Sequence, residues 1–174
     1  MLLFDLRLKF ARALIWHWLE IRGGARVPLE VDLDPRALLP CLTAIGIIDL
    51  TRPSKLMIAQ AGGTLRRRFG RDVRHMNWTE LVPPTLGDAG QQACERVRRT
   101  PCGFYHKFTV VPEGMEAVTA ETLVLPLMAR NAPLPHAAIG MTREFGTEES
   151  THTPPGWLTP SVPLAHYTMD FVDI

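Results

Sequence analysis

The chain has 174 residues, a formal net charge of +1, 46% hydrophobic residues and 21% charged residues. This length fits one domain with flanking segments, and the composition excludes a largely disordered chain. The small net charge excludes a surface that attracts nucleic acid or anionic lipid through one overall positive field.

The cysteines and the apolar runs indicate the compartment. Cys41, Cys94 and Cys102 include no C-x-x-C pair, and an odd number of cysteines cannot close a full set of disulfides. No run reaches the roughly 18 apolar residues of a membrane span, and charges such as Asp5 and Lys9 interrupt the apolar N-terminus where a secretory signal needs a continuous core. We therefore expect a cytoplasmic protein with reduced thiols and no membrane partner.

Residues 3–22 are predicted to form a helix that ends at Gly23-Gly24. Its charged residues share one narrow stripe, so its apolar arc is much wider than the roughly 100° that packing on one side requires. Because soluble monomers rarely expose a large apolar flank, we expect residues 1–24 to act as a dimerisation or capping helix of a homodimer. The alternative is that the C-terminal segment covers the second flank. The expected dimer interface consists of Phe4, Leu8, Ile15, Trp18 and Leu19.

The next part of the chain alternates short helices and strands. Asp34-Pro35 is a typical helix start, so a helix is predicted to about Ala44, although Pro40 lies inside it. Two short apolar runs, 45–50 and 56–61, surround turn-forming residues and predict a β-hairpin. A short helix over 64–69 and an amphipathic helix over 85–99 follow.

Three further strands are predicted over 104–111, 116–128 and 137–143, joined by turns into an antiparallel meander. The tail, 146–174, contains four prolines that break regular elements. Its aromatic residues argue against simple disorder, so we expect it to dock on the domain or to meet a partner. These aromatic residues are Trp157, Tyr167 and Phe171.

This order of elements predicts an α+β fold: a five-stranded antiparallel sheet with helices on one face, preceded by an N-terminal amphipathic helix. It resembles a PAS domain, and several short motifs are similar to those of a divergent bacterial PAS family. The motifs are Trp16 before Gly23-Gly24, Pro28, Asp32-Leu33-Asp34-Pro35, Pro40, Ile47-Ile48-Asp49, Gly63-Thr64, Phe69-Gly70-Arg71-Asp72, Leu123 and Leu125-Pro126-Leu127.

The resemblance covers about residues 10–145, and it divides the chain into a helix over 1–24, a PAS-like domain over 25–145 and a proline-rich tail over 146–174. It implies a sensory or regulatory module of bacterial signalling that binds a small molecule or a protein partner. It names no ligand, and the cofactor stays unknown.

A mostly apolar ligand pocket is expected between the meander and the central helices, with a volume of roughly 300 Å³ or more if it holds a typical ligand. His106 shares a strand face with apolar residues, which is typical either of a core histidine with a satisfied hydrogen bond or of a ligand contact. The expected lining consists of Phe104, His106, Phe108, Leu123, Leu125 and Ile139.

The sequence contains no residue set that is typical of catalysis or of structural metal binding. There is no G-x-S-x-G elbow, no phosphate-binding glycine loop and no H-x-x-x-H pair. We therefore expect no catalytic residue and no metal site. The alternative, an enzyme with an α+β cavity, would need Glu121 and His106 as its acid–base pair.

A second alternative is a regulatory protein that binds a nucleotide or a nucleic acid through arginines. Arg66, Arg67, Arg71 and Arg74 are the candidate anion-binding residues, and Arg96, Arg98 and Arg99 could extend the surface. Most arginine runs in short helices are solvated faces, and no aromatic residues are interleaved here to stack on bases. Binding of nucleic acid is therefore not expected.

Overall fold

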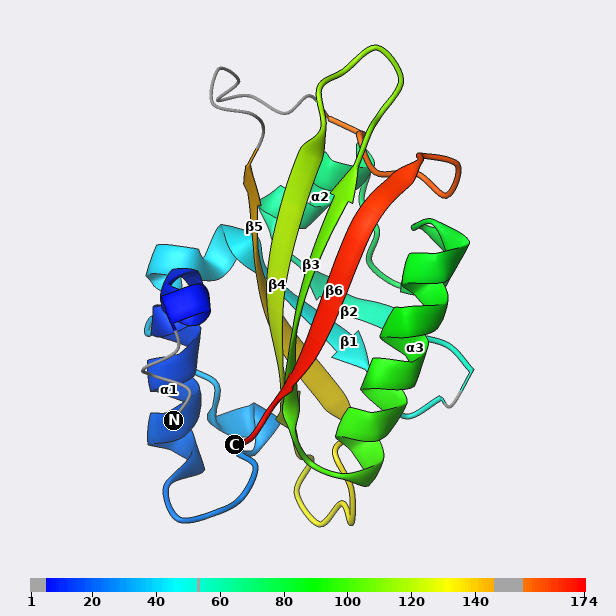
Figure 1. Cartoon of the computed structure of the whole chain (residues 1–174). Helices are drawn as coiled ribbons and strands as arrows, with labels where there is room; N and C mark the ends of the chain where they lie inside the picture. The colour runs from blue at the N-terminus through cyan, green and yellow to red at the C-terminus, as the bar shows by residue number, and fades with distance from the viewer. Residues whose placement is uncertain (1–5, 53, 146–154) are drawn as a thin grey trace.

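The computed structural model describes residues 6–52, 54–145 and 155–174 (Figure 1). Six antiparallel strands form one sheet in the order β2-β1-β5-β4-β3-β6. The strands are β1 (Ile45–Asp49), β2 (Met57–Ala61), β3 (Gly103–Val110), β4 (Val118–Leu127), β5 (Ala137–Phe145) and β6 (Leu164–Val172). The sheet therefore has one strand more than the five expected, and the α+β fold class is confirmed.

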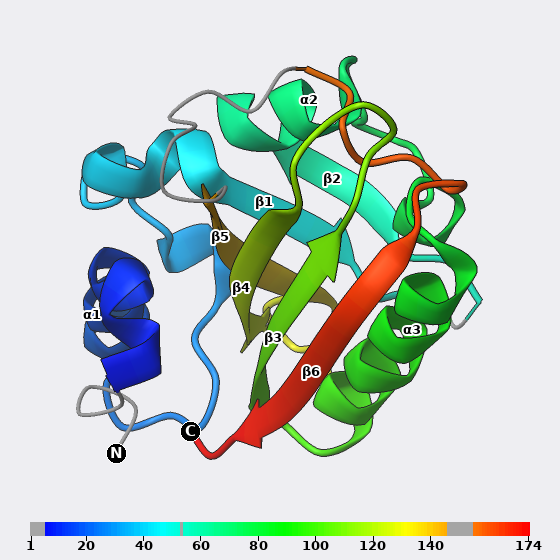
Figure 2. The same cartoon turned by 45° about the horizontal axis from the view of Figure 1, so that its top comes forward.

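Within the described residues, three α-helices accompany the sheet: α1 (Arg12–Arg22), α2 (Gly63–Phe69) and α3 (Pro84–Arg99). Figure 2 shows α1 on one side of the sheet and α3 on the other, with α2 at one end. Short 3-10 helices complete the fold: η2 (Leu6–Ala11), η3 (Glu30–Asp32), η4 (Leu39–Ala44) and η5 (Trp78–Glu80). No helix within the described residues is long and apolar enough to cross a membrane.

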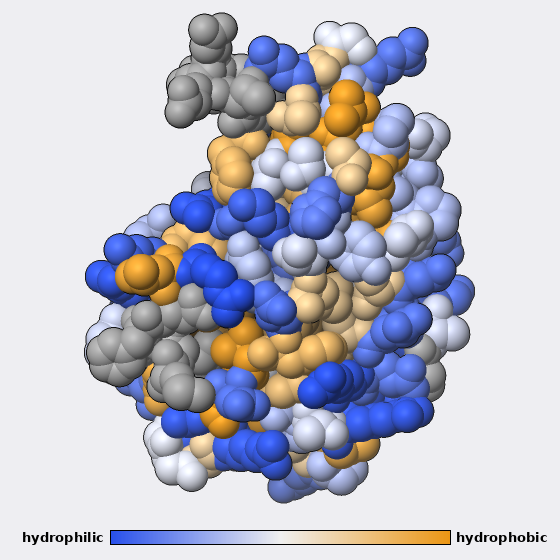
Figure 3. All heavy atoms as spheres, viewed as in Figure 1, coloured by the Kyte–Doolittle hydropathy of each residue, from blue (hydrophilic) through white to orange (hydrophobic). Residues whose placement is uncertain are grey.

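Both faces of the sheet are covered by apolar packing. On one face, Leu123, Leu125 and Ile139 belong to a cluster with α1. On the other face, Phe104 and Phe108 belong to clusters that include residues of α2 and α3. Figure 3 shows the view over α3 and β6, where hydrophilic residues gather over α3 beside a more hydrophobic band.

The N-terminal segment packs on its own chain. Leu8, Ile15 and Trp18 are at most 2% exposed, and the Trp18 indole N–H donates a 2.9 Å hydrogen bond to the carbonyl of Pro126. Leu19 is partly buried against the same cluster, and Phe4 lies outside the described residues. Leu8, Ile15 and Trp18 are therefore not presented to a second copy in the way that a dimer interface requires.

The chain itself covers the second apolar flank of this segment. Val27, Leu38 and Cys41 belong to the same buried cluster as α1, and the backbone N–H of Asp34 donates to Nε2 of His17 at 2.9 Å. Val172 and Ile174 of the C-terminal segment also pack against this cluster, so the tail contributes to the cover, although not through Trp157. A second copy is not needed to bury these residues, and only single apolar side chains such as Leu6 and Trp16 stay exposed.

Residues 34–44 do not form the continuous helix that their start signal predicts. They form turns followed by η4, in which Pro40 stands near the first position. A proline lacks the backbone N–H and its ring collides with the preceding turn, so it is tolerated at a helix start and not in the interior.

The C-terminal tail is more regular than its prolines suggest. Trp157 and Leu158 are buried, and the chain then forms β6, which pairs with β3 along its whole length. Tyr167 and Phe171 lie on β6 and are 39% and 38% exposed. Prolines precede β6 and do not occur within it, so the interpretation of 146–174 as a segment without regular elements was wrong for Leu164–Val172.

Candidate ligand cavity

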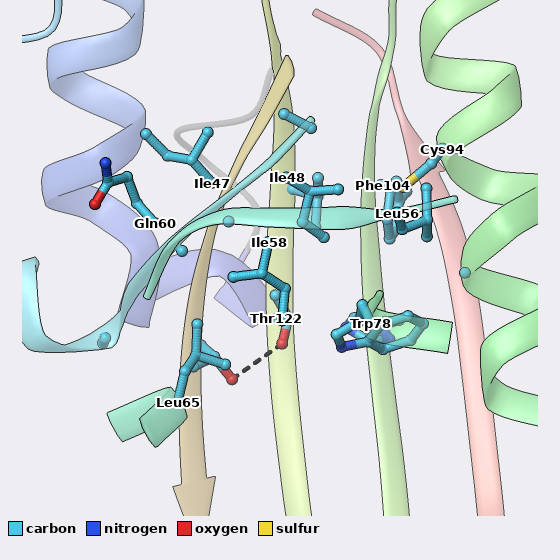
Figure 4. A pocket seen from close by; sticks show the side chains of 18 of the residues that line it. Ile47, Ile48, Leu56, Ile58, Gln60, Leu65, Trp78, Cys94, Phe104 and Thr122 are labelled. Atoms are coloured by element: carbon cyan, nitrogen blue, oxygen red, sulfur yellow. Dashed lines mark hydrogen bonds between the residues drawn. The ribbon is translucent and has the colours of Figure 1, made fainter. Parts of the chain in front are cut away.

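A partly open cavity of about 70 Å³, called the interior cavity below, lies between the sheet and the helices α2, η5 and α3. Figure 4 shows Ile58, Trp78 and Phe104 approaching it from β2, η5 and β3. Its wall is mostly apolar, and its volume is well below the roughly 300 Å³ of a typical ligand pocket. The polar groups on its wall are His106, Arg68, Thr122, Thr142, Gln60 and the thiol of Cys94.

The register of the sheet decides which residues reach the cavity. Phe104 pairs with Val124 and His106 pairs with Thr122, and directly opposed residues share a face of the sheet. These four line the cavity. Strand residues alternate between the faces, so the neighbours of Val124 point to the α1 side.

Four of the six expected lining residues are placed differently. Leu123, Leu125 and Ile139 lie on the opposite face, in the cluster with α1, and do not line the cavity. Phe108 is on the cavity side, but it packs beyond the cavity, with its ring 6.4 Å from that of Trp157. The expectation was wrong for the first three because both sets of alternating positions in these strands are apolar.

His106 is 6% exposed and stands between two phenylalanine rings, with ring centroids 5.9 Å from Phe104 and 5.7 Å from Phe108. Burial, followed by the nearby charge of Arg68, lowers the pKa of His106 to about 3. The imidazole is therefore neutral near pH 7. Its Nδ1 is buried and has no hydrogen-bond partner among the described residues.

Arg68 brings a charge to the cavity wall. Its side chain is 4% exposed; Nε donates to Oε1 of Glu144 at 2.8 Å, and a terminal nitrogen donates to the hydroxyl of Thr142 at 2.6 Å. Burial lowers the pKa of Arg68, while Glu144 acts in the opposite direction. The guanidinium also lies over the rings of Phe108 and Trp157, at 5.9 and 5.4 Å.

Sequence reasoning missed this role of Arg68, which was one residue in a run of arginines. A usable signal was present: Arg68 follows Leu65 by three residues in a short helix and therefore shares its face. Leu65 also lines the cavity. The run is thus not a uniform solvated face.

The remaining arginines of the anion-binding alternative are exposed and partly paired. Arg74 forms an ion pair with Asp72 at 2.6 Å, and Arg67 lies 3.8 Å from Glu144, whereas Arg66 and Arg71 are exposed. In Figure 1, α2 and the C-terminal end of α3, which carries the other expected arginines, lie at opposite ends of the sheet. The two arginine groups therefore do not form one surface.

The acid–base pair of the enzyme alternative is not assembled. Glu121 is opposite Lys107 in the β3–β4 pairing, on the α1 side of the sheet, while His106 faces the cavity. Glu121 forms ion pairs with Arg143 at 2.7 Å and with Lys107 at 3.5 Å. The sheet separates the two groups, so they cannot act on one substrate atom.

Cys94 on α3 is a cavity-wall residue without nucleophilic character. It is 2% exposed, and burial raises the pKa of its thiol to about 12. Because the thiolate is the reactive form of cysteine, the protonated Cys94 serves as a small apolar wall residue.

Comparison with known families agrees with this architecture. A model described as PAS domain matches residues 7–141. The chain belongs to the PAS domain family. The match spans α1, α2, α3 and nearly all of the five strands β1 to β5, so β6 lies outside the matched part of this PAS domain.

Other comparisons give more distant similarities to this PAS domain. No curated protein matches the chain. A solved structure of the Rhodobacter sphaeroides LOV protein is 12% identical, with 67% of this chain and 71% of that chain covered and a TM-score of 0.47. The structure of a fungal LOV domain photoreceptor is 18% identical, with 67% and 94% covered and a TM-score of 0.45.

Proposed function

We propose that this PAS domain is a sensory module of a signalling system, which binds a small molecule in its interior cavity and passes the occupancy of the cavity to a protein partner. The observation that carries the proposal is the buried, unpartnered Nδ1 of His106, a residue whose side chain is on the wall of the mostly apolar cavity. A buried polar atom without a partner costs roughly 1–3 kcal/mol. A ligand that hydrogen-bonds to His106 recovers that energy.

The dimensions of the cavity limit the ligand. A water molecule needs roughly 10–15 Å³ measured in this way, so about 70 Å³ suits a molecule of only a few heavy atoms. The neutral imidazole can either donate or accept a hydrogen bond, depending on its tautomer. We therefore propose a small, mostly apolar, uncharged ligand with one hydrogen-bonding group.

Arg68 offers a route from the cavity to the C-terminal segment. It lines the cavity, lies over the Trp157 ring, and its carbonyl accepts a 3.2 Å hydrogen bond from the backbone N–H of Leu158. Arg67 likewise accepts from Gly156 at 2.8 Å. A ligand that displaces the Arg68 guanidinium acts directly on Trp157, and through it on the segment that leads to β6.

The compartment and the assembly state belong to the same proposal. The three cysteines are buried and unpaired, which supports the reducing cytoplasm. A homodimer is retained as part of the proposal, in which Leu6 and Trp16, 72% and 58% exposed, supply the apolar contacts that the N-terminal segment leaves on its surface.

The test is a thermal-shift screen of small uncharged alcohols, ketones and amides, with the intrinsic tryptophan fluorescence of the chain as a second readout. A hit should raise the melting temperature of the wild type and not that of His106→Leu. Gly140→Ala provides a second variant, because a Cβ at this cavity-wall position meets its neighbours at 3.5 Å or more and fills space without a collision. If hits stabilise both variants as strongly as the wild type, the cavity is not the binding site and the proposal fails.

A further inference from the structure

A second pocket, of about 230 Å³ and also partly open to the surface, lies beside the interior cavity. Its walls come from α3, from the connection between β1 and β2, and from the connection between β4 and β5, which contributes Leu134. The floor is apolar: Leu50, Leu56 and Cys94 are only 2–3% exposed. This floor can receive the apolar body of a ligand.

The rim of the same pocket is cationic. Arg52, Arg98 and Arg99 line it together with a single carboxylate, that of Glu95. Arg99 is paired with Glu95 one helical turn away. Three guanidinium groups and one carboxylate leave a surplus of two positive charges around the pocket.

Two of these guanidinium groups are available for a ligand. Within the described residues, neither Arg52 nor Arg98 has a side-chain hydrogen bond or an ion pair, and Arg98 is half-buried. A charge that is partly removed from water interacts more strongly with an opposite charge than an exposed one does. The pocket therefore combines an apolar floor with an unneutralised, partly desolvated cation.

We propose that this pocket is a second binding site, for a small organic monocarboxylate whose apolar body packs on Leu56 and Cys94 and whose carboxylate pairs with Arg98 and Arg52. The planar guanidinium matches a carboxylate with two parallel hydrogen bonds, which gives both energy and orientation. The site is distinct from the α2 arginines, since it is built by α3 and the β1–β2 connection.

The second site and the interior cavity are proposed to bind different ligands, although the two share a wall. Leu56 and Cys94 line both spaces. A ligand in the outer pocket that moves these side chains changes the inner cavity, so binding at the two sites is coupled and each ligand changes the affinity of the other by the same factor.

The experiment is a calorimetric or NMR titration of the full chain with benzoate, with benzyl alcohol as the uncharged match and inorganic phosphate as the anion without an apolar body. Benzoate should bind saturably, at least about ten-fold more tightly than either control compound, and more weakly as salt is added. Arg98→Gln and Arg52→Gln should each weaken the binding of benzoate by about ten-fold. Arg66→Gln on α2 serves as the matched control and should leave the affinity for benzoate unchanged.

Several results would overturn the second site. Phosphate that binds as tightly as benzoate shows that the apolar floor is not used. Benzyl alcohol that binds as tightly, in the wild type and also in His106→Leu, shows that the arginines are not used. Equal benzoate affinity in Arg98→Gln, Arg52→Gln and the wild type places the ligand elsewhere. Because these arginines lie at a rim, an unchanged melting temperature in each variant verifies folding, and His106→Leu should retain benzoate binding even if the interior cavity binds nothing.

Discussion

Arg68 and Glu144 form a buried ion pair between α2 and the end of β5, with 2.8 Å between Nε and Oε1 and both side chains 4% exposed. The aligned geometry and the extra hydrogen bond from Arg68 to Thr142 offset the cost of removing both charges from water. The pair fixes the helix that closes one side of the cavity, and it therefore connects stability with the site.

Removal of one partner of this pair should be strongly destabilising. Glu144→Gln leaves the Arg68 cation buried without its counter-charge, so we expect a loss of about 3–5 kcal/mol in the free energy of unfolding, measured by urea denaturation. Glu95→Gln breaks the exposed pair with Arg99 and should cost less than about 1 kcal/mol. Similar losses in the two variants would contradict the buried description of Glu144.

Two neighbouring glycines before and within α2 should respond oppositely to alanine. A Cβ at Gly62 would lie 2.4 Å from the carbonyl oxygen of Thr43, a backbone atom that cannot move alone, so Gly62→Ala should lose about 1–3 kcal/mol. A Cβ at Gly63 meets nothing within 4 Å, and alanine favours the helix, so Gly63→Ala should gain up to about 1 kcal/mol. Thermal unfolding of both variants checks the signs, and a stable Gly62→Ala would refute the close approach.

The wild type should become less stable as the pH is lowered below 6.5, because His106 is buried as a neutral group. Its pKa is about 3 in the folded chain and 6.5 when unfolded, so below pH 6.5 the unfolded chain binds a proton that the folded chain does not. The contribution of the neutral His106 to the free energy of unfolding is fully present above pH 6.5 and is lost as the pH falls toward 3. Within this window the free energy of unfolding decreases by up to about 1.4 kcal/mol for each pH unit.

Urea denaturation at a series of pH values from 7 to 5 measures this effect. His106→Leu should show a flatter profile over the window, while the exposed control His166→Gln should follow the wild type. Above the window His106→Leu should also be as stable as the wild type or more so, because it removes a buried nitrogen without a partner. Parallel profiles for all three proteins would show that His106 is not buried as a neutral group.

Charges placed in the N-terminal segment should separate folding from assembly. Leu8→Glu and Ile15→Glu bury a carboxylate and should unfold the chain or cost several kcal/mol, because both side chains are at most 2% exposed. Leu6→Glu and Trp16→Ser affect exposed positions and should change stability by less than about 0.5 kcal/mol.

Sedimentation of the same proteins then tests the proposed homodimer. A wild type that is dimeric, with Trp16→Ser monomeric and equally stable, is the expected result. A monomeric wild type would end the dimer proposal, and a dimer that survives both surface variants would place the interface elsewhere.

The sequence by itself determined the order of most elements up to β5 and the resemblance to the PAS family. Local signals at Gly23 and Gly70 marked the ends of helices, and the alternation in 104–111 identified a strand. Such signals depend on neighbours within a few residues, so they are readable without the fold. They also placed Phe104 and His106 on one face of one strand, and these residues line the cavity.

The tertiary structure alone decided what faces the cavity across the strands. Val124 and Leu123 are both apolar and both buried, since each face of the sheet is covered at β4. The alternation along the strand therefore does not say which set of positions faces α1 and which set faces the cavity. The position of Arg68 and the pairing of β6 with β3 likewise depend on residues far away in the chain, such as Glu144 and Val172. Contacts of this kind form only when the whole sheet closes, because their energy comes from burial among residues that no local pattern names.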